Sequence, residues 1–182
     1  MKSKVSSKNL DIILTSLMIA IIFIAANIIK IPTIGGYVHM GDCMVFLSAV
    51  ILNKKRATLA SAIGMSLVDI FSGYIIWAPF TFLIKGLMAY IAASIIEKLK
   101  NKTIRTYLIS FTVSGVFMIV AYFFAGAIIA RILIGQVNNF ISAIIYSAKD
   151  ILGNIFQVVL GILIAVPLSK VLVLAKKRIF EK

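Results

Sequence analysis

Acidic residues, histidine and cysteine are all scarce in this sequence. Among its 182 residues there are 6 Asp or Glu, 1 His and 1 Cys. With His39 as the single histidine, a metal site of two histidines cannot form, and no other histidine could replace it in a catalytic triad. The single Cys43 excludes a disulfide within the chain. We therefore expect neither a bound metal nor another cofactor.

A phosphate-binding loop of the Walker A type is also missing, so the chain is not expected to hydrolyse nucleotides. No inverted repeat is visible, which argues against a secondary carrier. If the protein concentrates a solute, the energy must come from an ion gradient or from a partner. These absences favour a role other than that of an enzyme.

Apolar residues dominate instead, at 62% of the chain with a mean hydropathy of +1.09. Such values lie far outside the range of soluble proteins and predict an all-α integral membrane protein. A net charge of +13 would suggest a nucleic-acid partner for a soluble protein. Here the basic residues fall between apolar runs, so membrane topology explains them and no nucleic-acid partner is expected.

Six apolar runs predict six transmembrane helices in a single domain, 1–182. The first run lacks a small-residue cleavage site, so it is interpreted as a retained helix rather than a signal peptide. The second is short for a full crossing, which fits a helix that is tilted or begins below the outer interface. The expected spans are about 12–29, 43–52, 57–74, 77–96, 107–134 and 150–175.

Basic residues gather on alternate loops. Of the 19 in the chain, fifteen lie before span one, between spans two and three, between four and five, or after six. By the positive-inside rule both termini are then cytoplasmic. The segments 35–42, 72–74 and 135–139 face outward, and aromatic residues near them fit either an interfacial belt or ligand stacking.

Charged side chains inside the spans are informative, because burying a charge in lipid is costly unless it finds a partner. Asp69 and Lys85 both fall in the outer half of the membrane, where they could meet across the hairpin of spans three and four. Ser66 and Thr81 extend this polar layer. The pair is either a structural ion pair or part of a polar pocket that contacts a solute.

Span six favours the pocket. Asp150, Asn154, Gln157 and Gly161 follow i, i+4, i+7 and i+11 spacing, which places them on one helical face. Beyond Gly161 no polar side chain follows until Ser169. This pattern predicts a cavity that opens outward and is closed by apolar packing on the cytoplasmic side, rather than a channel.

Four motifs lie along the first half of the chain: GGYVHMGD at 35–42, NKKR at 53–56, DIFSGY at 69–74 and WAPFTFLIKG at 77–86. Together they resemble the substrate-binding S component of energy-coupling factor (ECF) vitamin transporters. The resemblance is specific as far as about residue 93 and rests mainly on topology over spans five and six. It implies a six-helix bundle in the bacterial plasma membrane that binds a water-soluble vitamin or precursor under the first outer loop.

The resemblance also implies partners and site residues. An S component associates with a transmembrane T subunit and two cytoplasmic ATPases, and topples in the membrane to release the solute. The T subunit contacts an Ala-xxx-Ala motif on the first helix, for which the nearest match is Ser16-xxx-Ala20. Gly41 and Asp42 are expected to shape the loop and cap the second helix. The implied substrate-binding residues are Tyr37, His39, Asp69, Trp77, Thr81, Lys85, Asn139, Tyr146, Asp150, Asn154 and Gln157.

The predicted ligand is a small, polar, aromatic heterocycle that stacks on Trp77, Tyr37 or Tyr146. A pyridoxine-like or hydroxymethylpyrimidine-like solute suits a compact pocket with mixed donors and acceptors. Riboflavin, pantothenate and a queuosine precursor also stay open.

Two other classes of protein stay open. An intramembrane enzyme would need paired carboxylates, which Asp69 and Asp150 could supply if they meet. A structural or accessory membrane subunit would use Asp69 and Lys85 only as a clamp between helices. If the pair is only a clamp, exchanging the two charges would restore both stability and function. If either residue contacts a ligand, the exchange would not restore binding.

Overall fold

A computed structural model describes residues 7–28, 30–33, 36–99 and 103–180. Over these residues the chain forms a bundle of helices with one antiparallel two-stranded hairpin. In chain order the elements are α1 Ser7–Ile28, β1 Lys30–Thr33, β2 Gly36–His39, α2 Gly41–Ile51, α3 Lys54–Phe71, α4 Ala78–Leu99, α5 Ile104–Ile128, the π-helix η1 Ile129–Leu133, α6 Phe140–Ala148 and α7 Ile151–Phe180.

Four of the described helical segments are long and apolar enough to cross a membrane: α1, α4, α5 continued by η1, and α7. The other two predicted spans are weaker. α2 has 11 residues, and α3, with 18 residues, opens with three basic side chains that lower its hydropathy. The four long helices agree with the predicted all-α membrane protein.

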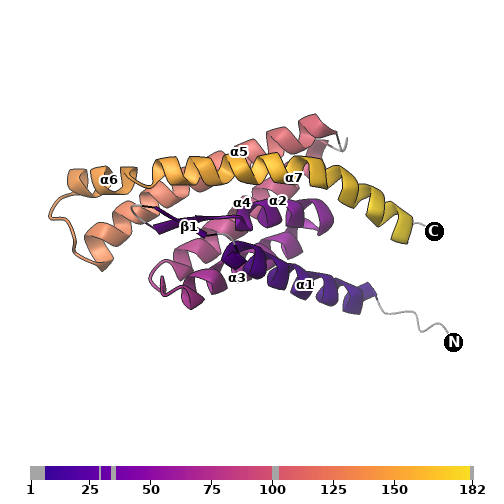
Figure 1. Ribbon diagram of the computed structural model, residues 1–182, viewed down its shortest axis with the longest axis horizontal. Helices are drawn as coiled ribbons and strands as arrows, with labels where there is room; N and C mark the ends of the chain where they lie inside the picture. The colour runs from indigo at the N-terminus through magenta and orange to yellow at the C-terminus, as the bar shows by residue number, and fades with distance from the viewer. Residues whose placement is uncertain (1–6, 29, 34–35, 100–102, 181–182) are drawn as a thin grey trace.

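α2 lies in the middle of the bundle, in contact with α1, α3, α4 and α7. α3 packs against α1 and α4, and α5 packs against α4 and α7. In Figure 1 the start of α1 and the end of α7 both lie toward the right, while α6 lies at the opposite end. Both ends of the described chain are therefore on one side of the bundle.

Small residues and caps determine how α3 is placed. An added Cβ at Gly64 would lie 2.9 Å from Cγ2 of Ile22, so α3 and α1 can approach this closely only without a side chain there. Asn53 caps α3 by accepting a hydrogen bond from the Arg56 N–H at 3.0 Å. Gly73, with φ of 83°, makes the tight turn that returns the chain toward α4.

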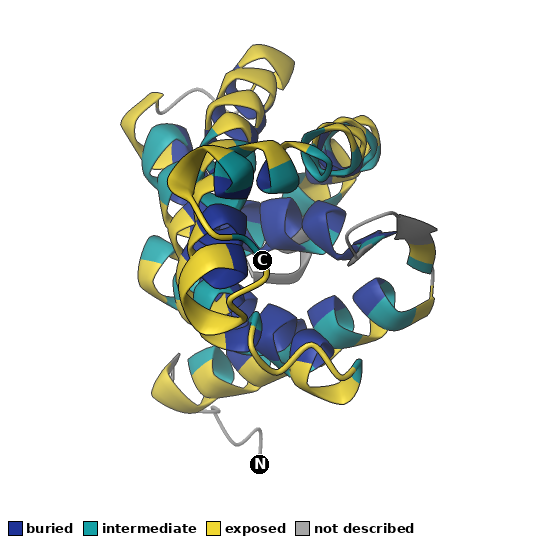
Figure 2. Cartoon of the chain, turned by 90° about the vertical axis from the view of Figure 1, so that its left-hand side faces the viewer, coloured by how far each residue is buried: buried dark blue, intermediate teal, exposed yellow. Residues whose placement is uncertain are grey.

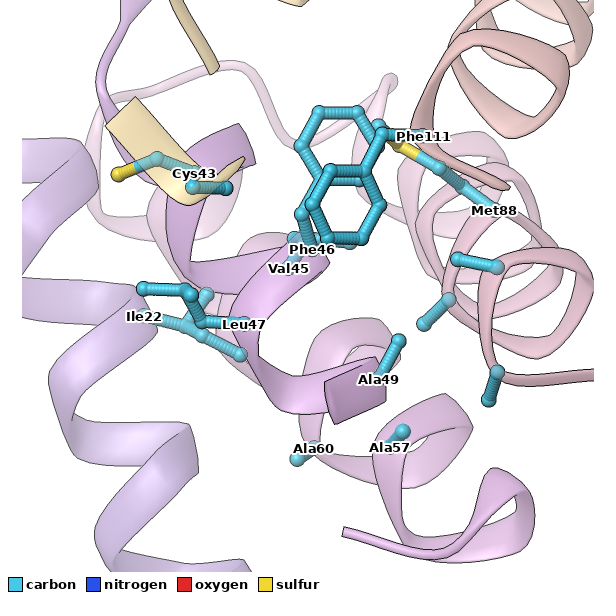
Figure 3. Close-up of a cluster of buried hydrophobic side chains, with 14 of the residues drawn as sticks. Ile22, Cys43, Val45, Phe46, Leu47, Ala49, Ala57, Ala60, Met88 and Phe111 are labelled. Carbon is cyan, nitrogen blue, oxygen red and sulfur yellow. The ribbon is translucent and has the colours of Figure 1, made fainter. Parts of the chain in front are cut away.

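The apolar core surrounds α2. Phe46 stacks on Phe111 with ring centroids 4.6 Å apart, and Ile22, Val45 and Met88 are fully buried in the same cluster (Figure 3). Figure 2 shows buried residues toward the middle and exposed ones on the outer faces of the helices. Because those faces carry many large apolar side chains, they suit contact with lipid.

The structure departs from the predicted loops in two places. Part of the stretch 35–42 is the strand β2 rather than irregular loop, and the segment between predicted spans five and six contains α6. Asn139 caps α6, because its side chain accepts the Ser142 N–H at 2.7 Å. Strands of four residues and a helix of nine are too short to appear as separate runs in a hydropathy pattern.

Candidate functional site

A cavity opens between the hairpin and the nearby ends of α3, α4, α5 and α7. It encloses about 650 Å³ of empty space, a volume that includes the solvent at its open mouth. The structure brings many of the predicted site residues together here. The lining residues are Tyr37, Val38, His39, Asp69, Tyr74, Trp77, Thr81, Tyr122, Asp150, Gly153, Asn154 and Gln157.

Polar contacts fasten the hairpin to the end of α3. The Tyr37 hydroxyl donates to Asp69 Oδ1 at 2.8 Å, and the Lys30 ammonium donates to the Ser72 hydroxyl. The Tyr37 ring also packs on Tyr74, with centroids 5.1 Å apart. Burial and the neighbouring Asp69 carboxylate raise the pKa of Tyr37, so its phenol stays protonated and remains a donor.

Asp69 has one oxygen left without a partner. Its side chain is 8% exposed, and Oδ1 accepts the bond from Tyr37. Oδ2 is buried and accepts no hydrogen bond of normal length among the described residues, and the Thr81 hydroxyl is a nearby donor. A buried polar atom left unpaired costs free energy. Since Asp69 lines the cavity, an N–H or O–H group of a ligand would supply the missing hydrogen bond.

Aromatic side chains form another part of the wall. Tyr122 reaches in from α5 and donates to the Thr81 hydroxyl at 3.0 Å. Trp77 packs at an angle on Tyr122, with ring centroids 6.1 Å apart. Tyr122 was not predicted from the sequence, because a tyrosine within an apolar span gives no sign that it faces a cavity. Together these rings offer flat faces for a ring-shaped ligand.

A buried ion pair lies behind the cavity wall. Lys85 Nζ is 2.5 Å from Asp42 Oδ1, and both side chains are 1% exposed. Gln157 donates from Nε2 to Asp42 Oδ2 at 2.8 Å, while its Oε1 accepts the backbone N–H of His39 at 3.3 Å. The amide of Gln157 therefore links α7 both to the charged pair on α2 and α4 and to the hairpin.

This pairing corrects two predictions. Lys85 forms its salt bridge with Asp42 rather than Asp69, so the predicted meeting of Asp69 and Lys85, whether as a clamp or as part of a pocket, is wrong, and Lys85 does not line the cavity. Asp42 does not cap α2, whose N-cap is Met40 without a side-chain hydrogen bond. Because α2 is buried on most sides, an Asp in its first turn points into the protein and needs a cation there.

The polar face of α7 agrees with its predicted spacing. Asn154 and Gln157 on α7, and Asp150 directly before it, all line the cavity. Gly161, one turn further, lies against α2, where an added Cβ would be 3.1 Å from the Phe46 ring. Polar residues therefore face the cavity, and the next position on the same face packs against the apolar core.

Asn139 and Tyr146 lie outside this cavity. Asn139 is exposed and its side chain is used by the cap of α6. Tyr146 lies on α6 and lines a second, smaller cavity. Both positions follow from the presence of α6, which was not predicted. Val38, Tyr74 and Gly153 line the main cavity instead, each close in sequence to a predicted residue.

The predicted docking residues, Ser16 and Ala20, are both exposed on α1. Ile13, Leu17 and Ile24 on the same helix are also exposed. Small residues between larger apolar ones suit close contact with another membrane helix. The role of this face in docking stays a prediction.

His39 is expected to make the protein less stable in mild acid. Its Nδ1 accepts the Gly41 N–H at 3.2 Å, and burial lowers its pKa from 6.5 to about 4. Between these values the unfolded chain binds a proton that the folded chain does not. The free energy of unfolding therefore falls as pH drops below 6.5, with a loss of about 2 kcal/mol at pH ~5.

Thermal unfolding at pH ~5 and ~7.5 measures this effect. The control is His39→Gln, whose amide oxygen can accept the same Gly41 N–H but does not titrate. The difference in melting temperature between the two pH values should be smaller in the variant. An equal difference in both proteins would show that His39 is not responsible.

Long apolar helices around a cavity lined by aromatic and polar groups define a membrane protein that binds a small solute. The sequence model of the family described as "ECF-type riboflavin transporter, S component" matches residues 6–174, and the chain belongs to this family. It is therefore a substrate-binding subunit of an ECF transporter, a transport subunit rather than an enzyme.

The chain is also similar to a protein of Pyrococcus woesei described as an uncharacterized protein in gap 3'region. The two are 30% identical over 151 residues, which cover 83% of this chain and 90% of the relative.

Proposed function

We propose that this chain captures a flat heteroaromatic vitamin of the flavin type from outside the cell, in the cavity beneath the hairpin. In this proposal the helical bundle lies in the plasma membrane, with α2 inside it as a half-length helix and with both termini in the cytoplasm. A transmembrane T subunit, docked on the α1 face around Ser16 and Ala20, and two cytoplasmic ATPases power release of the vitamin inside. The family supports partners of this kind.

One observation carries the proposal: the cavity combines aromatic faces with an unpaired, buried carboxylate oxygen, Asp69 Oδ2. The isoalloxazine ring of a flavin is flat and carries an imide N–H between two carbonyl groups. Its N–H suits the carboxylate of Asp69, and one of its carbonyls suits the amide N–H group of Asn154. Tyr37, Trp77 or Tyr122 can stack on the ring.

The family description names riboflavin, which favours a flavin over a ligand with one ring. Pyridoxine and hydroxymethylpyrimidine, the ligands favoured from the sequence alone, each contain one six-membered ring. The one-ring vitamins are therefore the competing ligands in the test.

The test is a binding screen of the detergent-purified chain against riboflavin, pyridoxine, hydroxymethylpyrimidine and pantothenate. Riboflavin is expected to raise the melting temperature, because a ligand at 1,000 times its Kd stabilises the folded state by about 4 kcal/mol. It should also quench Trp77, the single tryptophan, which lies on the cavity wall.

Trp77→Phe is the matched control for this screen. The variant should lose the quenching and keep the thermal shift, because a phenyl ring can still stack on the ligand. A thermal shift with pyridoxine or hydroxymethylpyrimidine and none with riboflavin would overturn the flavin assignment. Well-folded protein that responds to none of the four would contradict the proposed vitamin cavity.

A further inference from the structure

A second cavity adjoins the first. It encloses about 340 Å³ of empty space, including the solvent at its open mouth, and shares two residues, Trp77 and Asp150, with the larger cavity. Its other walls come from α5, η1, α6 and the segment before α7. The complete lining is Trp77, Gly126, Ile129, Ala130, Ile134, Gln136, Tyr146, Ser147, Lys149 and Asp150. The function proposed above gives this space no role.

The backbone around the second cavity has an unusual form. α5 continues into the π-helix η1, in which the Ile134 N–H donates to the Ile129 carbonyl at 3.0 Å. π-Helical turns are rare and occur often at functional sites. An added Cβ at Gly126 would lie 2.5 Å from Ser147 Oγ, so α5 and α6 meet closely at this position. The wide turn and the close contact together frame the space.

The polar groups that line this space carry both signs of charge. The Lys149 ammonium lies over the Tyr146 ring, 3.4 Å from its centroid, and the next residue in the chain is Asp150. Gln136 adds an amide that both donates and accepts hydrogen bonds. An anionic group would be attracted by Lys149 and repelled by Asp150. A neutral chain with several hydroxyl groups can instead donate to the carboxylate and accept from the ammonium.

We propose that the second cavity binds the neutral polyhydroxyl side chain of a ligand whose ring lies in the first cavity. The assignment rests on the proposed function, because it assumes a ring-bearing vitamin in the larger space. Trp77 and Asp150 line both cavities and therefore lie at the boundary between them, which a ligand that occupies both would cross. The second cavity then selects ligands by their tail, while the first selects them by their ring.

The experiment compares two flavins with the same ring. Riboflavin carries a polyhydroxyl chain, and lumiflavin has a methyl group in its place. Two variants change the second cavity: Lys149→Gln removes the ammonium, and Ala130→Leu fills space beside η1. Each should weaken riboflavin binding about tenfold. Lys149→Gln removes one hydrogen bond to the polyhydroxyl chain, and Ala130→Leu takes up part of the space for it. Lumiflavin affinity should change less than about twofold.

Arg131→Gln is the matched control. Arg131 lies in η1 next to Ala130 and carries the same charge as Lys149, but it is exposed and does not line either cavity. Its loss should leave the affinity for both flavins unchanged. Lys149 is half-buried near the surface, so Lys149→Gln keeps the test valid if Ala130→Leu disturbs the fold.

The outcomes separate the two proposals. If the cavity variants change both affinities equally, or neither, the tail assignment is wrong while the main cavity still binds the flavin ring. If folded wild-type protein binds neither flavin, the proposed substrate is wrong, and the assignment of the second cavity to the polyhydroxyl chain is then also wrong. A loss confined to riboflavin supports both.

Discussion

Asp69→Asn is expected to weaken binding of riboflavin about a hundredfold without unfolding the protein. The carboxylate holds Tyr37 with one oxygen and leaves the other unpaired at the cavity. A hydrogen bond from a ligand N–H to a buried carboxylate is charge-assisted, and such bonds are the strong ones. Asparagine keeps the size of the side chain but replaces one oxygen by an NH₂ group, which would face the ligand N–H as a second donor.

Fluorescence titration gives the affinity, and thermal unfolding without ligand shows whether the fold is intact. Ser66→Ala is the matched control, because Ser66 lies on the same helix, is equally buried, and uses its hydroxyl only for the carbonyl of Ile63 at 3.1 Å. Tyr37→Phe should cause a smaller loss than Asp69→Asn, since the carboxylate remains. Unchanged affinity in a folded Asp69→Asn protein would rule out this carboxylate as the ligand's partner.

Removing either member of the Asp42–Lys85 pair is expected to destabilise the protein by about 3–5 kcal/mol. Asp42→Asn leaves a buried ammonium without its counter-charge, and Lys85→Met leaves a buried carboxylate with Gln157 as its remaining partner. Such a loss is a large share of a typical stability of about 5–15 kcal/mol. We expect the melting temperature of each single variant to drop steeply, or folded protein to be lost.

The double variant separates the ion pair from general damage to the core. In Asp42→Asn with Lys85→Met no charge stays buried, so stability should return to within about 2 kcal/mol of the wild type. The exposed pair Lys54–Glu97, 40% and 47% exposed with 3.4 Å between Nζ and Oε2, is the control. Its removal should cost less than about 1 kcal/mol. Additive losses in the Asp42 and Lys85 variants would mean that the two charges do not stabilise each other.

The helices that could be predicted from sequence are those with long apolar runs. α1, α4 and α7 appear as such runs, and the turn at 72–74 that ends α3 was also predicted, in agreement with the positive φ of Gly73. The hairpin and α6 were missed, because each is shorter than the window in which hydropathy is informative. Tertiary contacts with α3 and α5, not local propensity, hold them in place.

The part of the site formed by the beginning of α7 was predictable from the sequence. The spacing of Asp150, Asn154 and Gln157 places them on one face whatever the rest of the bundle does. Which carboxylate pairs with Lys85 was not predictable, because Asp42 and Asp69 both lie in the same part of the bundle. Only the packing of α2 against α4 and α7 decides between them.

α2 is a half-length helix in the middle of the bundle. Its 11 residues rise about 16 Å, roughly half of a hydrocarbon layer of about 30 Å. The residues directly before α2 form β2 instead, and Tyr37, Val38 and His39 on this strand line the cavity. The chain that a full-length helix would use is therefore available as cavity wall. In such an architecture, the residue at which one helix begins decides how much of the neighbouring chain can contact the ligand.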